Sequence, residues 1–289
     1  MAATAPGPKL LAIVGPTASG KSALAFKIAQ KFSGEIITAD SRTIYKGMDI
    51  GTAKPSTTDQ QKVPHWGLDL VEPGQHYSAF EFKKYAQAKI KDISNRDKLP
   101  ILVGGTGLYA EAVLYDFGFR LPPDPKRRAE LEKLSIDELK GIIHEHGLPM
   151  EKNVQNPRHL IRIIETGGQI HSKKAKLEPG VLLVGLMPVD EVLKSNIAKR
   201  AESVVEQGII EETRRLLQGY GHHSLLGTAG IAYKAIAKLI KGEINDFEAV
   251  DLIEKAELQY ARKQKTWFNK IAHKVPFLKN KISPSTRHK

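Results

Sequence analysis

The chain has 289 residues, 41% of them hydrophobic and 26% charged, and its formal net charge is +12 because 44 Lys and Arg residues outnumber 32 Asp and Glu residues. This composition excludes disorder over most of the chain. The absence of cysteine excludes disulfides, thiolate nucleophiles and cysteine zinc sites. No apolar run approaches the roughly 18 to 20 residues that cross a membrane. Because Met1 to Lys9 also lacks the apolar stretch of a signal peptide, we expect a cytoplasmic protein with no membrane partner, and a monomer is the simplest assembly.

Short apolar runs alternate with helical patterns over the first hundred residues. The expected strands are Leu10–Val14, Glu35–Ala39 and Pro100–Val103, and the expected helices are Ser22–Phe32 and Tyr77–Ile93. Each strand is a short apolar run that ends at a glycine or an aspartate. Because strands and helices alternate, we expect an α/β protein with a parallel sheet flanked by helices on both faces.

The pattern changes after residue 120. Leu121–Pro125 breaks the chain with three prolines, and helical periodicity with only weak strand signals follows it. A strand returns at Val181–Leu186, and long helices are expected after Pro188 and over Ala249–Phe268. We therefore expect an α/β core formed by residues 1–120 and 181–289, interrupted by a small helical domain at 121–180.

The residues after the first strand match the phosphate-loop pattern at every fixed position. They are Gly15, Pro16, Thr17, Ala18, Ser19, Gly20, Lys21 and Ser22. The glycines allow successive backbone N–H groups to form a nest for an anion, and the start of the next helix adds a positive dipole end. Lys21 supplies a positive charge for terminal phosphate oxygens, and the Ser22 hydroxyl is a ligand for Mg²⁺. The sequence therefore predicts a phosphate-binding loop.

Polar residues follow the second and third strands, at the edge where ligands gather in open α/β sheets. Asp40 ends the second strand, where a carboxylate can hold Mg²⁺ or act as a general base. It begins a polar, glycine-containing stretch over 40–55 that is typical of a functional loop. Gly104–Tyr109 follows the third strand and brings the Thr106 hydroxyl to the same edge.

The positive charge is concentrated toward the C-terminus. From Tyr260 to Lys289 there are nine basic residues and no acidic one. This is the electrostatic footprint of a nucleic-acid binder, although a solubilising tail has the same composition. Trp267 and Phe268 favour binding because aromatic rings stack on bases, but they could equally anchor the last helix to the core.

Several separated motifs resemble those of the tRNA dimethylallyltransferases, also called tRNA isopentenyltransferases, of the bacterial type. In family order they are the phosphate loop, Asp40–Ser41 with Asp49–Pro55, Gly104–Tyr109, Asn156–Glu165 and Gln264–Phe268. The run Asp-Ile-Gly-Thr-Ala-Lys-Pro is specific to that family, and the resemblance spans nearly the whole chain. Within this run, Asp49 and Lys54 either structure the loop or act in function, and the sequence leaves both open. The resemblance implies a P-loop NTPase-like sheet with an inserted helical domain.

The resemblance also implies a reaction. A dimethylallyl group would pass from dimethylallyl diphosphate to the exocyclic amine of the adenosine immediately 3′ of the anticodon in tRNA. By family role, Asp40 would be the general base, Thr106 would hydrogen-bond the target base, and Thr17 would lie between donor and acceptor. The phosphate loop and Mg²⁺ would hold the diphosphate leaving group, and Arg128 would approach it.

A tRNA-binding surface follows from the same resemblance, because the target base must be extruded from the anticodon loop. Its residues would be Asp40, Ser41, Arg42, Thr43, Thr106, Arg158, His159, Leu160, Ile161 and Arg162. The helical insertion would grip the anticodon arm, and the basic C-terminal helix would contact the backbone. The chain departs from the family pattern at Thr43, Trp66, His159, Ala232 and Lys263, which could change tRNA preference.

Two other interpretations share the phosphate loop. A P-loop small-molecule or nucleoside kinase would use Asp40 to activate a hydroxyl, and it would have no need for the basic C-terminal helix. A non-enzymatic RNA-binding protein would use the loop as a nucleotide-dependent switch, and it should tolerate Asp40→Asn.

Overall fold

The computed structural model describes residues 7–119, 124–150, 154–168, 176–228, 230–271 and 277–278. The chain divides into two compact units, one of residues 1–114 with 177–289 and the other of residues 115–176. The chain returns from the smaller unit to the larger one between residues 176 and 177, four residues before the expected boundary at 180/181. The expected first boundary at 120/121 lies outside the described residues.

The larger unit is built on a parallel sheet of six strands in the order β3-β2-β4-β1-β5-β6. The strands are β1 (Leu10–Val14), β2 (Gly34–Thr38), β3 (His65–Trp66), β4 (Leu99–Gly104), β5 (Val181–Leu186) and β6 (Phe277–Leu278). The four strands expected from apolar runs are confirmed to within one residue at each end. The dipeptide strands β3 and β6 are too short to give a periodic signal.

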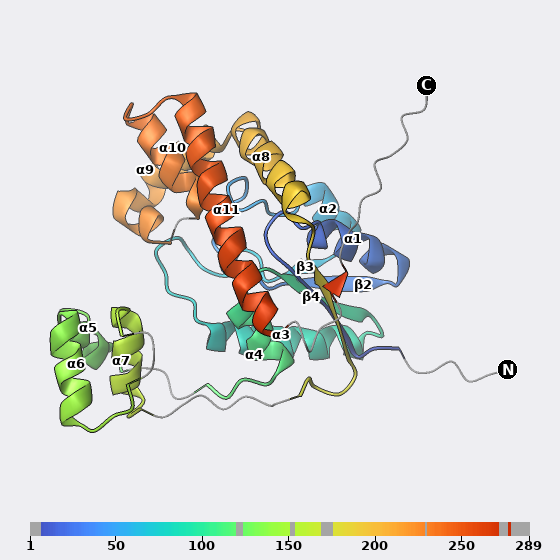
Figure 1. Cartoon of the computed structure of the whole chain (residues 1–289). Helices are drawn as coiled ribbons and strands as arrows, with labels where there is room; N and C mark the ends of the chain where they lie inside the picture. The colour runs from blue at the N-terminus through green and yellow to red at the C-terminus, as the bar shows by residue number, and fades with distance from the viewer. Residues whose placement is uncertain are drawn as a thin grey trace. The chain divides into compact units, whose positions relative to one another are not determined.

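Continuous apolar runs identify the centre of the sheet because its strands are covered on both faces. Every residue of β1 is buried, and β1 pairs with both β4 and β5. On one face, Leu11 and Ile13 form a cluster with Ala25 and Ala29 of helix α1 (Lys21–Lys31). Helix α3 (Ala79–Asn95) lies on the opposite face in Figure 1. The expectation of a helix-flanked parallel sheet is confirmed.

Helices from the C-terminal half pack together beside the sheet. They are α8 (Asp190–Glu206), α9 (Ile209–Thr228), α10 (Ile231–Ile240) and α11 (Asp246–Ile271), and two shorter helices of the unit are α2 (Thr57–Lys62) and α4 (Gly107–Leu114). Helices α8 and α11 match the expected ones, whereas α9 and α10 were not identified from the sequence. In α9 the backbone leaves the helical region at Gly221, where φ is 73°, which interrupts the apolar period.

The smaller unit contains α5 (Pro125–Leu131), α6 (Ile136–Glu145) and α7 (Pro157–Glu165). Each helix begins at a polar cap, Asp124, Ser135 or Asn156, whose side chain accepts a hydrogen bond from a backbone N–H of the first turn. Leu160 and Ile161, at 0% and 2% exposure, belong to the apolar core of this unit. Their side chains therefore have no surface for RNA, which corrects their expected place on the tRNA-binding surface.

In the residues that the structure describes, no helix is long and apolar enough to span a membrane.

Candidate functional site

A cavity of about 570 Å³ opens at the carboxyl edge of the sheet in the larger unit. The phosphate loop, the ends of β2 and β4, the stretch 40–55 and helices α8, α10 and α11 form its walls. The expected site residues that line it are Thr17, Ala18, Ser19, Gly20, Lys21, Ser22, Asp40, Arg42 and Thr43. One cavity thus holds both the predicted anion-binding loop and the predicted general base.

The phosphate loop turns tightly between β1 and α1. Gly20 has a φ of 85°, and a side chain at Gly15 would overlap with the carbonyl oxygen of Leu186. The Lys21 ammonium donates to the Pro16 carbonyl at 3.0 Å, and burial lowers the pKa of Lys21 to about 8, although the nearby Asp40 carboxylate opposes this shift. The Ser19 hydroxyl is buried without a hydrogen-bond partner. Among the described residues, the loop therefore keeps one buried hydroxyl without a partner, on a residue that lines the cavity.

Asp40 and Thr106 come from neighbouring strand ends and are joined through Ser41. The Ser41 N–H donates to the Thr106 hydroxyl at 3.0 Å, and the Asp40 carboxylate accepts from the Arg42 N–H at 2.8 Å. The Thr106 N–H donates to the carbonyl of Ala39. The expectation that both side chains meet at one edge of the sheet agrees with this geometry, while their chemical roles stay predictions.

Two charged residues of the cavity wall, Arg200 and Glu257, are not predicted by any sequence motif. The Arg200 guanidinium donates to the Thr17 hydroxyl at 2.8 Å, and its Nε atom lies 3.4 Å from the Glu257 carboxylate. Glu257 is buried, and burial raises its pKa while Arg200 and Lys21 oppose that shift. Both residues lie within long amphipathic helices, α8 and α11. A charged residue there has the same sequence signal as a solvated helix face, so only tertiary structure identifies it.

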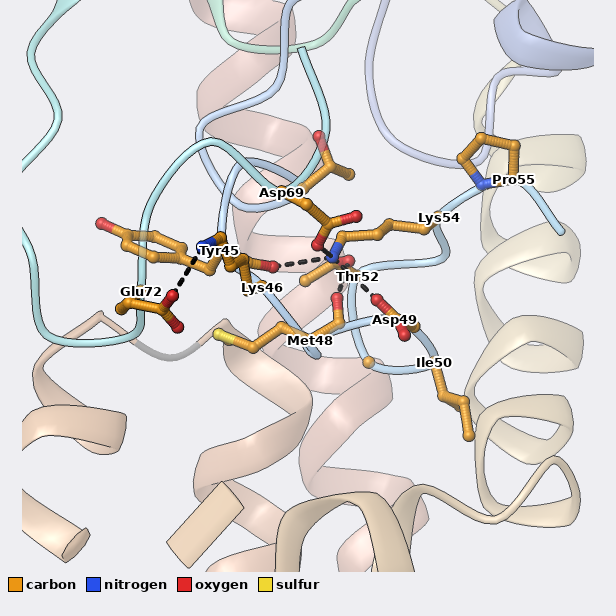
Figure 2. A network of polar contacts seen from close by, with 12 residues as sticks. Tyr45, Lys46, Met48, Asp49, Ile50, Thr52, Lys54, Pro55, Asp69 and Glu72 are labelled. Atoms are coloured by element: carbon orange, nitrogen blue, oxygen red, sulfur yellow. Dashed lines mark hydrogen bonds and ion pairs between the residues drawn. The ribbon is translucent and has the colours of Figure 1, made fainter. Parts of the chain in front are cut away.

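Lys54 holds the family-specific run together through three polar contacts (Figure 2). Its ammonium donates to the Tyr45 carbonyl at 2.7 Å and to the carboxylates of Asp49 at 2.7 Å and Asp69 at 2.5 Å. The Lys54 side chain is only 3% exposed. Because all three donors of the ammonium are used, the structure favours a loop-forming part for Lys54. For Asp49, whose side chain is 54% exposed, both alternatives stay open.

A buried carboxylate holds the same run from the other side. Glu212 of α9 accepts hydrogen bonds from the N–H groups of Asp49, Ile50 and Gly51 at 3.0 to 3.3 Å. It also accepts one from the Tyr233 hydroxyl of α10 at 2.6 Å. Because Gly51 lines the cavity, this anchor sets the position of one cavity wall.

We expect Glu212→Gln to lower the free energy of unfolding by about 3 kcal/mol, because an amide cannot accept from three backbone donors and a hydroxyl at once. Tyr233→Phe removes one of the four donors and should cost about 1 kcal/mol. Urea unfolding of both variants tests this. Glu211→Gln is the control, because Glu211 precedes Glu212 in the same helix and its side chain is 74% exposed. Equal losses for all three variants would contradict the anchor.

The remaining expected site residues belong to the smaller unit. Arg128 pairs with Glu132 at 3.0 Å and with Glu165 at 3.2 Å, and Arg162 also pairs with Glu165 at 3.2 Å. Arg158 is exposed. The two paired guanidinium groups have carboxylate partners inside their own unit, so the part of Arg128 in diphosphate binding stays a prediction.

The positions that depart from the family pattern have different surroundings. Thr43 and Ala232 line the cavity, so substitutions there can change what it accepts. The Trp66 indole donates to the Glu35 carboxylate at 2.8 Å, which explains a tryptophan at the sheet edge. Lys263 is exposed. The His159 Nε2 atom is buried, and it has no hydrogen-bond partner among the residues that the structure describes.

Comparisons with known proteins agree with the motifs. The sequence model of the IPP transferase family matches residues 43–271. A tRNA dimethylallyltransferase of Staphylococcus epidermidis is 36% identical over 279 residues, which cover 90% of this chain and 84% of that protein. One of Carboxydothermus hydrogenoformans is 38% identical over 278 residues, which cover 91% of this chain and 89% of that protein.

Solved structures give the same result. The full-length tRNA isopentenylpyrophosphate transferase of Bacillus halodurans has a TM-score of 0.68 and 32% identity, covering 94% of this chain and 90% of that one. A eukaryotic dimethylallyltransferase acting on tRNA has a TM-score of 0.76 over 93% of this chain and 73% of that one, and at 22% identity it supports the fold alone. These likenesses confirm the predicted P-loop NTPase-like fold class.

Proposed function

The chain belongs to the IPP transferase family, and from that membership we propose that it transfers a dimethylallyl group from dimethylallyl diphosphate to the exocyclic amine of the adenosine immediately 3′ of the anticodon in tRNA. The observation that supports this most is the single cavity that contains both Lys21 and Asp40. A phosphate loop suits the diphosphate of the donor, and a carboxylate at the strand end suits proton removal from the acceptor.

The reaction assigns a task to each end of the cavity. The amine nitrogen attacks the terminal carbon of the dimethylallyl group, the bond from this carbon to the diphosphate oxygen breaks, and the amine proton passes to Asp40. The N–H groups of the phosphate loop and the Lys21 ammonium stabilise the charge that develops on the leaving diphosphate. Thr17 lies between the two ends and is oriented by Arg200, while Thr106 faces the target base.

The residues of the phosphate loop fit a magnesium ion held mainly by the diphosphate. In the described ranges, no three or more His, Asp or Glu residues gather in a way that could hold a metal ion. Mg²⁺ commonly keeps several waters and takes one or two protein oxygens beside phosphate oxygens. The Ser22 hydroxyl at the start of α1 would be such a ligand, with the unpartnered Ser19 hydroxyl nearby in the same loop. When bound, Mg²⁺ neutralises charge on the leaving diphosphate.

The direct test is incubation of the protein with Mg²⁺, labelled dimethylallyl diphosphate and unmodified tRNA that carries adenosine 3′ of the anticodon. Digestion and mass analysis should reveal the prenylated nucleoside. Consumption of ATP without that product, over a varied pool of tRNA, would favour the alternative kinase.

The exposed basic side of α11 supports tRNA as the acceptor. Arg262 and Lys263 are exposed on this helix, whereas Lys265 is paired with Asp190. The basic residues Lys274, Lys279, Lys281, Arg287 and Lys289 lie outside the described residues. A contact with the phosphate backbone would use the exposed cations Arg262 and Lys263.

Replacing both Arg262 and Lys263 by Gln should weaken tRNA binding and reduce the slope of log Kobs against log salt by roughly 1 to 2. Filter binding at several salt concentrations measures this slope. Lys234→Gln with Lys238→Gln makes the same charge change on exposed positions of α10 and is the control. An equal change of slope for both pairs would argue against a contact at α11.

A further inference from the structure

The motif Gln264–Phe268 of α11 has no task in the mechanism described above. Gln264 is 6% exposed, and both polar groups of its amide are used. The carbonyl oxygen accepts from the Thr17 N–H at 2.8 Å, and the NH₂ group donates to the Gly105 carbonyl at 2.9 Å. Both partners are backbone groups of loops that border the cavity.

The glycines of the Gly104–Tyr109 motif permit this contact. A Cβ atom on Gly105 would overlap with the Gln264 amide, and a Cβ atom on Gly107 would overlap with the Trp267 ring. The two motifs, far apart in the sequence, are therefore complementary halves of one close interface. Glycine is required here because a helix approaches the backbone directly.

Gln264 joins the two ends of the cavity. Thr17 belongs to the phosphate loop, whereas Gly105 immediately precedes Thr106, whose hydroxyl contacts Ser41 beside Asp40. The helix that carries Gln264 is itself fixed, because Ile253, Ala261 and Phe268 on it are buried. A side chain on a rigid helix can hold two loops at a constant separation.

We propose that Gln264 is a positioning residue that sets the spacing between the diphosphate end of the cavity and the end at Asp40, which Thr106 contacts through Ser41. This inference rests on the proposed prenyl transfer. Gln264 lines the cavity, and its amide would act through the two loops that it holds rather than through a substrate.

The expected consequence is a loss in rate rather than in binding. Transfer requires the amine nitrogen to approach the donor carbon opposite the bond that breaks, and a displacement of about 1 Å at such a centre costs roughly 10²-fold in rate. The Lys21 ammonium contacts the Pro16 carbonyl and the Asp40 carboxylate contacts the Arg42 N–H, so neither charged group depends on Gln264 for its hydrogen bond. The affinities for diphosphate and for tRNA should therefore change little.

Gln264→Met tests this because methionine has a similar length and no amide. We expect kcat to fall roughly 10²-fold, while KM for donor and tRNA and the calorimetric Kd for inorganic diphosphate with Mg²⁺ stay within about threefold. Gln264→Asn, which keeps the amide but is one methylene too short to reach both loops, should lose kcat in the same way. Gln259→Met replaces an exposed glutamine of the same helix and should change nothing.

Two results would overturn the inference. One is a kcat of both Gln264 variants within about threefold of the wild type, and the other is a fall in diphosphate affinity equal to the fall in kcat. Diphosphate binding is measured without tRNA, so it also reports whether the variants are folded. A wild-type protein that binds diphosphate but prenylates no tRNA would instead refute the proposed function.

Discussion

Asp40→Asn should lower kcat for prenyl transfer by roughly 10² to 10⁴, the usual weight of general base catalysis, while tRNA affinity stays within a few-fold. Asparagine is nearly isosteric with aspartate and keeps an oxygen that can accept from the Arg42 N–H, so the local turn should survive. What it loses is the capacity to take the amine proton. The measurement is single-turnover transfer to tRNA, with tRNA binding determined separately.

Asp59 provides the matched control for this variant. It is an aspartate that lines the same cavity, on α2 rather than at the end of β2. Asp59→Asn changes the charge of the cavity equally, so an electrostatic effect alone would appear in both variants. A transfer rate for Asp40→Asn close to that of the wild type would refute the role of Asp40 as general base. Absence of transfer by the wild-type protein, with RNA binding intact in both proteins, would instead favour a protein that only binds RNA.

The sequence predicted those parts of the site that depend on consecutive residues. The phosphate loop follows an apolar strand and precedes a helix, so its place at the sheet edge follows from chain order alone. The shared edge of Asp40 and Thr106 follows in the same way, because parallel strands end on the same side. Strand runs were recognisable because the centre of the sheet is covered on both faces.

The residues that join distant segments were not predictable. Arg200, Glu257 and Gln264 lie on helices whose apolar stripe was recognised, but the stripe says nothing of what its polar neighbours face. Glu212 lies in α9, which the sequence patterns did not identify, and it is the buried acceptor for the family-specific run. Such contacts depend on tertiary packing, so a single sequence carries no local signal for them. The burial of Leu160 and Ile161 shows the converse error, in which a motif match placed core residues on a binding surface.

The second large effect concerns Lys21, whose ammonium is the charged group of the phosphate loop. Lys21→Met should weaken diphosphate binding by about 10- to 10²-fold, since a hydrogen bond to a charged group contributes about 1.5 to 3 kcal/mol. Transfer should lose roughly 10²- to 10³-fold in rate, because the charge on the leaving diphosphate is greatest in the transition state. Calorimetry with diphosphate and Mg²⁺, together with single-turnover transfer, separates the two losses.

The pH dependence of diphosphate binding shows how much of the affinity comes from the charge of Lys21 rather than from the packing of its side chain. In the free protein the pKa of Lys21 is lowered to about 8 by burial, and a bound anion must raise it. Above pH 8 the free lysine is neutral, so binding must take up a proton, and affinity should fall by up to about tenfold per pH unit until the pKa of the complex is reached. Below pH 8 Lys21 is already charged, and its contribution is fully present. Titrations in two buffers of different ionisation heat measure the proton uptake. Lys21→Met retains only the titration of the ligand, so it should take up fewer protons than the wild type above pH 8. Equal proton uptake by the wild type and the variant would show that another group carries the proton.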